Sequence, residues 1–473
     1  MTEAETTIAA DEIAPAAPTR ELAGTLRIAV PLALTNLGNI AMNTTDVVML
    51  GWLGAEALAA GMLGATTLVL FMLMGFGVTA AVPPLAAQAH GAGDAIGLRR
   101  TIRQGFWAVV LFSAPAIAIL MQGEALLLLA GQDPDAARRA GDYLVIAAWS
   151  LPFILGIMVL RALLATLARA GIVFVITCFG IVINAAINWG LIFGNWGLPR
   201  LEVTGAAVAT TTTSAIGFLV LALYVALHPA TRGYRVFSRL WRPDLDRLKA
   251  IGRLAWPISL TMLCEEGLFV ASTLMVGWLG PLALAGHTVA LQCASVAFMV
   301  PLGVAQAATV RVGLAAGRGD RAGVGTAGWM AFALGLGFMA CVALVFWLTP
   351  GVLARGFLDF DDPDAATVFA TAVTLLGVAA VFQLFDGAQV VGLGVLRGLN
   401  DTRVPLAFAL IGYWVVGAPL AYTLGFVAGY GAVGVWSGFI GGRGLGAVLS
   451  MTRFARREQI GLLTALAPAS RSG

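Results

Sequence analysis

Charged side chains are scarce in this chain. Only 11% of its 473 residues are Asp, Glu, Lys or Arg, whereas 59% are hydrophobic. A soluble domain carries about 25% charged residues, so the charge present is too little to cover a water-facing surface. Disorder is excluded as well, because disordered chains combine high charge with few large apolar side chains. The composition therefore indicates a helical protein that crosses a membrane several times.

Lysine is nearly absent, since Lys249 is the only lysine among 28 basic residues. A phosphate-binding loop of the G-x-x-x-x-G-K-[ST] type needs a lysine after a glycine-rich turn, and Lys249 lies instead between Leu248 and Ala250. We therefore expect no ATP hydrolysis by this route. The formal net charge of +3 is too small to indicate a nucleic-acid partner.

Cysteine and histidine are also rare, with four and three residues. The cysteines stand singly in apolar stretches, without a CxxC pair or the Cys/His spacing of a metal site. A membrane-embedded enzyme would need such a constellation near the membrane surface. We expect no cofactor, no structural metal and no enzymatic activity.

Long apolar runs fill most of the chain. A helix needs about 20 largely apolar residues to cross a bilayer, and the sequence offers twelve such runs with Gly, Pro and Asp in the gaps. The runs are continuously apolar rather than alternating, so they predict helices and not a β-barrel. The expected spans are 28–50, 57–82, 104–122, 140–160, 172–194, 204–227, 251–276, 282–308, 325–349, 366–395, 404–426 and 432–452.

Arginine is concentrated in alternate gaps between these spans. The gaps after the second, sixth and eighth spans and the C-terminal tail hold most of the basic residues. The gap after the ninth span is acidic, with Asp359, Asp361, Asp362 and Asp364. Since basic loops stay on the cytoplasmic side, we expect a multi-pass membrane protein with both termini in the cytoplasm.

An internal repeat divides the chain in two. Residues 27–94 align without a gap to residues 253–320, an offset of 226, and 21 of the 68 pairs are identical. Each half holds six spans, so the halves have the same orientation, and substrate is expected near mid-membrane between them. The identical pairs include Pro31 and Pro257, Trp52 and Trp278, and Asp94 and Asp320.

The expected fold class is an all-α membrane protein with twelve transmembrane helices in two parallel, pseudo-symmetric six-helix lobes. The first residues are polar and rich in Ala and Pro, and they lack the pattern of a signal peptide. The expected parts are a disordered cytoplasmic tail (1–25), an N-terminal lobe (26–228), a cytoplasmic linker (229–250), a C-terminal lobe (251–452) and a second cytoplasmic tail (453–473).

Four acidic residues fall inside expected spans: Asp46, Glu265, Glu266 and Asp386. A charge at the centre of a span costs about 2.5–3.5 kcal/mol on insertion scales, so such residues face the bundle interior and mark ion or substrate paths. Apart from Arg161 and Arg443, which we place near span ends, no basic residue lies at comparable depth. A cleft with acids and no bases suits proton capture, supplies oxygen ligands for a small cation and favours cationic substrates. The alternative is a structural hydrogen bond between helices.

Other polar or kinking residues lie in the same spans. Glu265 and Glu266 point about 100° apart on a helix, so we expect at most one of them at the cleft centre. Asn184 and Asn188, at i and i+4, share one helix face and are candidates for a polar stripe beside Asp46, or for hydrogen bonds between helices. His287 is expected to be structural. Candidate hinge or cleft-lining residues are Pro31, Pro257, Gln292, Pro301 and Gln306.

Six short runs carry a family resemblance: 45–51, 265–269, 285–287, 301–303, 308–313 and 386–401. Through them, and over most of the chain, the sequence resembles the multidrug and toxic compound extrusion (MATE) family, most closely its bacterial NorM-like branch. The longest run, from Asp386 through Arg397 to Asp401, is the most specific.

The resemblance implies two six-helix lobes and export of amphipathic organic cations, in exchange for Na⁺ or H⁺, by alternating access. Glu265 and Asp386 match the family's cation-coupling acids, with Glu266 as a second candidate in a position that is usually apolar in this branch. Asp46, Asn184 and Asn188 match its proton-linked cluster in the N-terminal lobe. From the resemblance we expect a monomer in the lipid bilayer of the bacterial inner membrane.

Three other functions compete with drug export. Lipid-linked oligosaccharide flipping is performed by related folds, but it would favour several basic residues to hold pyrophosphate, and these are missing. The scattered histidines argue against a membrane-embedded enzyme. A passive channel is disfavoured by the duplicated halves and by the small number of charges available to line a pore.

Overall fold

The computed structural model describes residues 18–358 and 363–463, which contain α-, 3₁₀- and π-helices and no strand. Eleven helical stretches in these ranges are long and apolar enough to cross a membrane. They correspond to the second through twelfth expected spans. The ends of the two expected tails, at residues 1–17 and 464–473, and Asp359, Asp361 and Asp362 of the expected acidic gap lie outside the described residues.

The first expected span lies in α2 (Pro18–Gly51), a helix of 34 residues. Its length is sufficient to cross a bilayer, but Asn36, Asn39, Asn43 and Asp46 make its second half more polar than the other eleven stretches. Helix α2 begins at Pro18, so residues 18–25 of the expected tail are helical.

The described chain divides into two compact units. The N unit comprises Leu34–His90 and Asp94–Ser259, and the C unit comprises the described residues up to Ala33, Gly91–Gly93 and those from Leu260 onward. Helix α2 and helix α12 (Leu245–Gly277) each contribute to both units.

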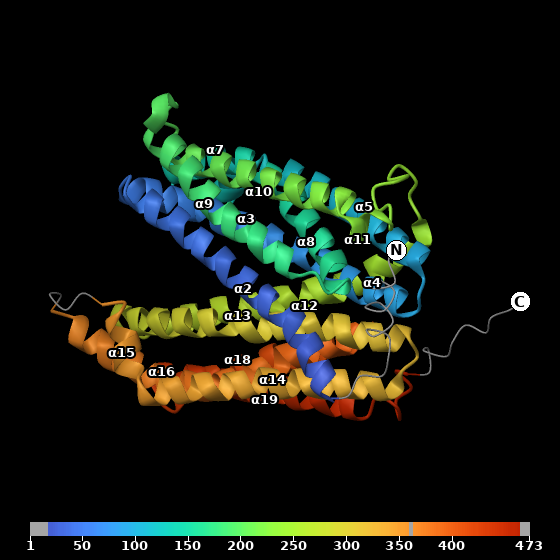
Figure 1. Ribbon diagram of the computed structural model, residues 1–473. Helices are drawn as coiled ribbons and strands as arrows, with labels where there is room; N and C mark the ends of the chain where they lie inside the picture. The colour runs from blue at the N-terminus through green and yellow to red at the C-terminus, as the bar shows by residue number, and fades with distance from the viewer. Residues whose placement is uncertain (1–17, 359–362, 464–473) are drawn as a thin grey trace, which may run out of the picture. The chain divides into compact units, whose positions relative to one another are not determined.

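The N unit is a helical bundle with two apolar cores. Helices α3, α7 and α10 surround the first core, and α5, α8 and α10 surround the second (Figure 1). Besides its parts of α2 and α12, the unit contains α3 (Ala55–Thr79), α4 (Val82–Gly91), α5 (Ala95–Leu120), α6 (Gly123–Leu129), α7 (Pro134–Ala147), η1 (Ala148–Ser150), α8 (Leu151–Thr166), α9 (Gly171–Phe193), η2 (Asn195–Gly197), α10 (Glu202–Leu227) and α11 (Pro229–Arg232).

The expected linker is attached to the N unit by side chains of α5. Arg103 Nη1 donates to the carbonyl of Ser238 at 2.8 Å, and Trp107 Nε1 donates to the carbonyl of Leu240 at 2.8 Å. Donors from a membrane helix therefore satisfy backbone carbonyls of a segment without regular structure. Within the expected range of the linker, α11 occupies the start and α12 begins at Leu245.

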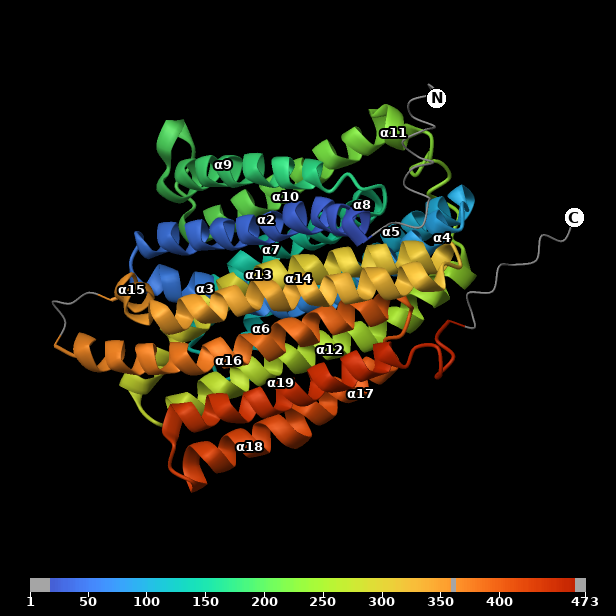
Figure 2. The same cartoon turned by 60° about the horizontal axis from the view of Figure 1, so that its bottom comes forward.

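The C unit packs its long helices side by side (Figure 2). An ion pair between Glu21 and Arg311 attaches the start of α2 to α13. Two stretches of the eleventh span, η3 and η4, are π-helical. The unit contains α13 (Pro281–Gly317), α14 (Arg321–Leu348), α15 (Pro350–Arg355), α16 (Ala365–Gly398), α17 (Arg403–Leu410), η3 (Ile411–Gly417), α18 (Ala418–Tyr422), η4 (Thr423–Val427) and α19 (Gly431–Ala455).

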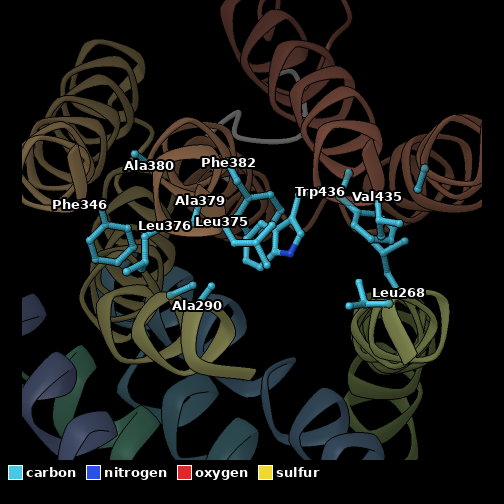
Figure 3. Packing of buried hydrophobic residues seen from close by; sticks show 14 of the residues in the cluster. Leu268, Ala290, Phe346, Leu375, Leu376, Ala379, Ala380, Phe382, Val435 and Trp436 are labelled. Carbon is cyan, nitrogen blue, oxygen red and sulfur yellow. The ribbon is translucent and has the colours of Figure 1, made fainter. Parts of the chain in front are cut away.

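Aromatic side chains fill the core of the C unit. Phe382 of α16 and Trp436 of α19 pack edge to face, with ring centroids 5.4 Å apart (Figure 3). Leu268 of α12 and Ala290 of α13 belong to the same cluster. The core thus joins the consecutive helices α12 and α13 to α16 and α19, which come much later in the sequence.

The sequence repeat is also a repeat of local structure. Gly54 and Gly280, which the offset of 226 pairs, have φ angles of 113° and 114° and precede the helices α3 and α13. Asp94 and Asp320 are equivalent caps, each accepting a hydrogen bond from the backbone three residues on. Such a cap satisfies a free N–H at the helix start. The glycine and aspartate that end each copy of the repeat therefore specify the same turn before α5 and before α14.

Close packing of α13 on α16 requires a glycine at position 394. A Cβ there would overlap the backbone of Ala305, and Thr309 Oγ1 donates to the carbonyl of Gly394 at 2.8 Å. Gly394→Ala is expected to lower the midpoint of thermal unfolding in detergent, because overpacking costs about 1–3 kcal/mol. Gly377→Ala, on the same helix, meets open space and should leave the midpoint unchanged or raise it. Equal midpoints would contradict this packing.

Candidate functional site

Three charged side chains meet inside the C unit. Glu265 comes from α12, Asp386 from α16 and Arg443 from α19. Arg443 Nη1 lies 2.7 Å from Glu265 Oε1, with hydrogen-bond geometry, and 2.7 Å from Asp386 Oδ1 as an ion pair. Asp386 is 3% exposed and Arg443 1%. We call Glu265, Asp386 and Arg443 the charged triad.

Aromatic rings enclose the guanidinium of Arg443. Its central carbon lies 4.8 Å from the ring centroid of Tyr413, 5.1 Å from that of Phe269 and 5.8 Å from that of Phe382. Arg443 Nη1 also donates to Tyr413 Oη at 3.3 Å. A guanidinium is attracted to the faces of aromatic rings, so these rings hold the charge in place where water is excluded.

Glycines allow the backbones near the triad to approach closely. A Cβ on Gly442 of α19 would overlap the carbonyl oxygen of Gly412 and approach the backbone of Gly417. Both partners lie in the π-helical stretch η3, which also carries Tyr413. Single π turns often occur at functional sites in membrane helices and elsewhere, and here one carries the hydroxyl that contacts Arg443.

The expectation that the acids lack a basic partner is wrong. Arg443 lies in the middle of α19 and not near a span end, and it contacts both Glu265 and Asp386. Glu265 is therefore the member of its pair that reaches the triad. Glu266 is half-buried and is not part of these contacts. Arg161, which is also buried, donates to Asn36 Oδ1 at 3.0 Å in the N unit.

Several polar atoms of the triad are buried without a hydrogen-bond partner among the described residues: Asp386 Oδ1, Arg443 Nε and Arg443 Nη2. A buried unsatisfied polar group costs about 1–3 kcal/mol. The triad therefore leaves an acceptor and two donor nitrogens without hydrogen bonds. Asp386 Oδ1 is held by the charge of Arg443 without a hydrogen bond, and a carboxylate oxygen is a ligand for a small cation once that charge moves away.

A second polar chain lies beside the triad's aromatic rings. Trp436 Nε1 donates to His287 Nδ1 at 3.0 Å, so the proton of a neutral His287 lies on Nε2, which is 3.3 Å from Thr273 Oγ1. Thr273 in turn donates to the carbonyl of Phe269. A small cavity lined mainly by apolar and aromatic side chains, among them Phe382, adjoins this chain. His287 thus bridges α12, α13 and α19.

The N unit holds a separate polar cluster around Asp46. Asn188 Nδ2 donates to Asp46 Oδ1 and, at 3.1 Å, to Asn184 Oδ1. Thr210 Oγ1 donates to Asp46 Oδ2 at 3.3 Å. Both asparagines are fully buried, so the i, i+4 spacing does bring them to one face beside Asp46. Thr210 was not expected, since a threonine in an apolar span gives no distinctive signal.

The remaining candidates are spread over three helices. Pro31 lies inside α2, Pro257 inside α12 and Pro301 inside α13. Gln306 is half-buried and Gln292 exposed, both on α13. None of them belongs to the triad or to the Asp46 cluster, and their hinge or cleft-lining role stays a prediction.

A comparison with protein families identifies the chain. The model of the family MatE matches residues 31–190 and 257–423, which together exceed half of the sequence. The chain belongs to the MatE family. The matched ranges include Asp46, Glu265 and Asp386, whereas Arg443 lies beyond them.

Curated relatives agree with the MatE assignment. A protein of Mesorhizobium japonicum named "Probable multidrug resistance protein NorM" is 44% identical over 444 residues, which cover 93% of this chain and 95% of the relative. A protein of Burkholderia vietnamiensis named "Multidrug resistance protein NorM" is 42% identical over 442 residues, with coverages of 93% and 95%. The resemblance to this family, stated above from short runs, is confirmed.

Solved MATE structures share the fold. The eukaryotic MATE transporter AtDTX14 superposes with a TM-score of 0.83 at 20% identity, covering 95% of this chain and 100% of that one. A multidrug resistance MATE family transporter in an outward-facing conformation gives 0.84 at 20% identity, with coverages of 94% and 96%. The all-helical MATE-type fold expected from the sequence is confirmed.

Proposed function

We propose that this protein is a secondary active multidrug efflux transporter, which exports amphipathic organic cations in exchange for Na⁺ or H⁺ by alternating access. The names of its MatE relatives support export of drugs. The arginine distribution supports an orientation with both ends in the cytoplasm, and the bacterial relatives support a place in the inner membrane. Since no phosphate-binding loop is present in the sequence, the energy is proposed to come from an ion gradient.

The observation that carries the proposal is the meeting of two acids inside a membrane-spanning helical unit. Glu265 and Asp386 come from two helices and converge on one point of the C unit. Acidic side chains in such surroundings are expensive and serve as ion sites by default. Carboxylate oxygens are ligands for small cations and acceptors for protons, so the pair can bind the coupling ion.

The charge of the site supports a cationic cargo. When ionised, the two carboxylates and the Arg443 guanidinium sum to one negative charge, because arginine stays protonated in proteins. This is less negative than two acids alone, yet it still attracts a cation.

The Asp46 cluster is the proposed site for proton coupling in the N unit. Asn188 and Thr210 donate hydrogen bonds to the carboxylate of Asp46. Asn188 also donates to Asn184, which fixes the position of both amides. These neighbours are all neutral, so proton binding removes the charge of Asp46 without breaking an ion pair.

The membrane potential adds about 2.3 kcal/mol per translocated charge per 100 mV, which is sufficient for more than tenfold accumulation of the cargo.

Proteoliposomes with a fluorescent organic cation test the function. We expect movement of the dye when a sodium gradient or a pH gradient is imposed, and none without a gradient. A sodium response assigns coupling to Glu265 and Asp386, whereas a response to the pH gradient alone assigns it to Asp46. If the dye does not move under either gradient, drug export is contradicted. Scrambling of a labelled lipid-linked oligosaccharide by the same proteoliposomes would then indicate a flippase.

A further inference from the structure

We propose that Arg443 is a tethered cation that competes with the coupling ion for Glu265 and Asp386. The guanidinium occupies the carboxylate pair, and the ion gains a complete site only when the guanidinium gives up one acid. Arg443 thereby sets how many ions the pair binds. The proposal rests on the proposed coupling role of the two acids and adds a residue that lies beyond the part of the chain matched by the family.

A single nitrogen holds both acids. Arg443 Nη1 lies 2.7 Å from Glu265 Oε1 and 2.7 Å from Asp386 Oδ1. Only the contact with Glu265 has the geometry of a hydrogen bond, and Asp386 Oδ1 has no hydrogen bond among the described residues. The guanidinium therefore holds Asp386 by charge alone, whereas it holds Glu265 by charge and by a hydrogen bond.

The guanidinium has a place to stay after it releases Asp386. Tyr413, Phe269 and Phe382 surround it, and Tyr413 Oη accepts a hydrogen bond from Nη1 at 3.3 Å. These contacts do not involve Asp386. Arg443 Nε and Nη2 are buried without partners among the described residues, so small rotations of the guanidinium would break no further hydrogen bond.

Charge counting gives the number of ions. Glu265, Asp386 and Arg443 sum to one negative charge, which one sodium ion or one proton neutralises. Among the described residues, Glu266 of α12 and Arg397 of α16 also interact electrostatically with Glu265. Their charges are opposite, so the sum does not change. Without Arg443 the sum is two negative charges, and two monovalent ions are needed.

Ion binding to the purified full-length protein tests the count. Radioactive sodium titrated into the wild type should saturate at one ion per protein, and into Arg443→Gln at two. The first ion should bind Arg443→Gln at least about tenfold more tightly, because a competing charge a few ångströms away has been removed. If the coupling ion is H⁺, Arg443→Gln should take up one proton more than the wild type on acidification in sodium-free buffer.

Two further variants separate charge from structure. Arg453→Gln removes an arginine of the same helix that forms an ion pair with Asp401, and it should bind ions as the wild type does. Arg443→Lys keeps the positive charge, so it should again bind one ion. Sodium should raise the unfolding midpoint of Arg443→Gln more than that of the wild type, because tighter binding stabilises the folded state more.

The outcomes distinguish this proposal from the proposed function. One ion with unchanged affinity in Arg443→Gln, or two ions in Arg443→Lys, overturns the role of Arg443 even if Asp386→Asn abolishes binding. If Asp386→Asn and Glu265→Gln both bind ions with the stoichiometry and affinity of the wild type, the coupling site itself is overturned. If Arg443→Gln does not fold, the charge-balanced variant with Arg443→Gln and Glu265→Gln should bind one ion at least about tenfold more tightly than the wild type, and weaker binding overturns the proposal.

Discussion

Asp386→Asn should reduce ion-driven export of an organic cation by at least about tenfold, equivalent to about 1.4 kcal/mol. The substitution keeps the size of the side chain and leaves Arg443 paired with Glu265. It removes one negative charge, so the triad becomes neutral and no longer attracts the coupling ion. Transport is measured as dye movement in proteoliposomes at matched protein content.

The matched control for this prediction is Asp401→Asn. Asp401 is a half-buried acid that is also paired with an arginine of α19, Arg453. It lies outside the triad, and we expect its removal to leave transport within about twofold of the wild type, because isolated ion pairs contribute little. Equal losses in the two variants would mean that Asp386 acts through stability and not through ion binding.

The second large effect is expected for Asp46→Asn in the N unit. An asparagine can still accept the hydrogen bond from Asn188 and can donate to Thr210, so the cluster should stay folded. It cannot lose or gain a proton, and dye export driven by a pH gradient should fall by at least about tenfold, or about 1.4 kcal/mol. The assay compares initial rates under a pH gradient and under a sodium gradient.

Asp142→Asn serves as the control, because Asp142 is exposed on α7 in the same unit. It should transport as the wild type does. If Asp46→Asn loses sodium-driven and pH-driven export equally, Asp46 is not specific to proton coupling. Full activity of Asp46→Asn under a pH gradient would remove the N-unit cluster from the mechanism.

The helices could be predicted because their signals are local. An apolar run of sufficient length is visible in a window of the sequence, and the paired turns at Gly54 and Gly280 recur at a fixed offset. The Asn184 and Asn188 face follows from helix periodicity in the same way. The π-helical stretch at Ile411–Gly417 could not be predicted, since its sequence suits an α-helix and packing against Gly442 accompanies the change.

The partner of the acids was missed for a different reason. Arg443 is separated from Glu265 by 178 positions, so no local pattern links them. Its depth was also misjudged, although it lies at the centre of the expected span 432–452. An arginine at the centre of a membrane span is itself the signal, because its cost requires an acidic partner nearby.

The location of Arg443 has a consequence for how the protein is made. Synthesis proceeds from the N-terminus, and Arg443 lies in α19, the last of the described helices. Glu265 and Asp386 therefore enter the membrane before their counter-charge has been translated. Until α19 inserts, the acids must be neutralised by protons or by ions from solution. Completion of the C unit is thus coupled to the arrival of its final helix, and nascent chains that stop before Arg443 would carry two unpaired acids.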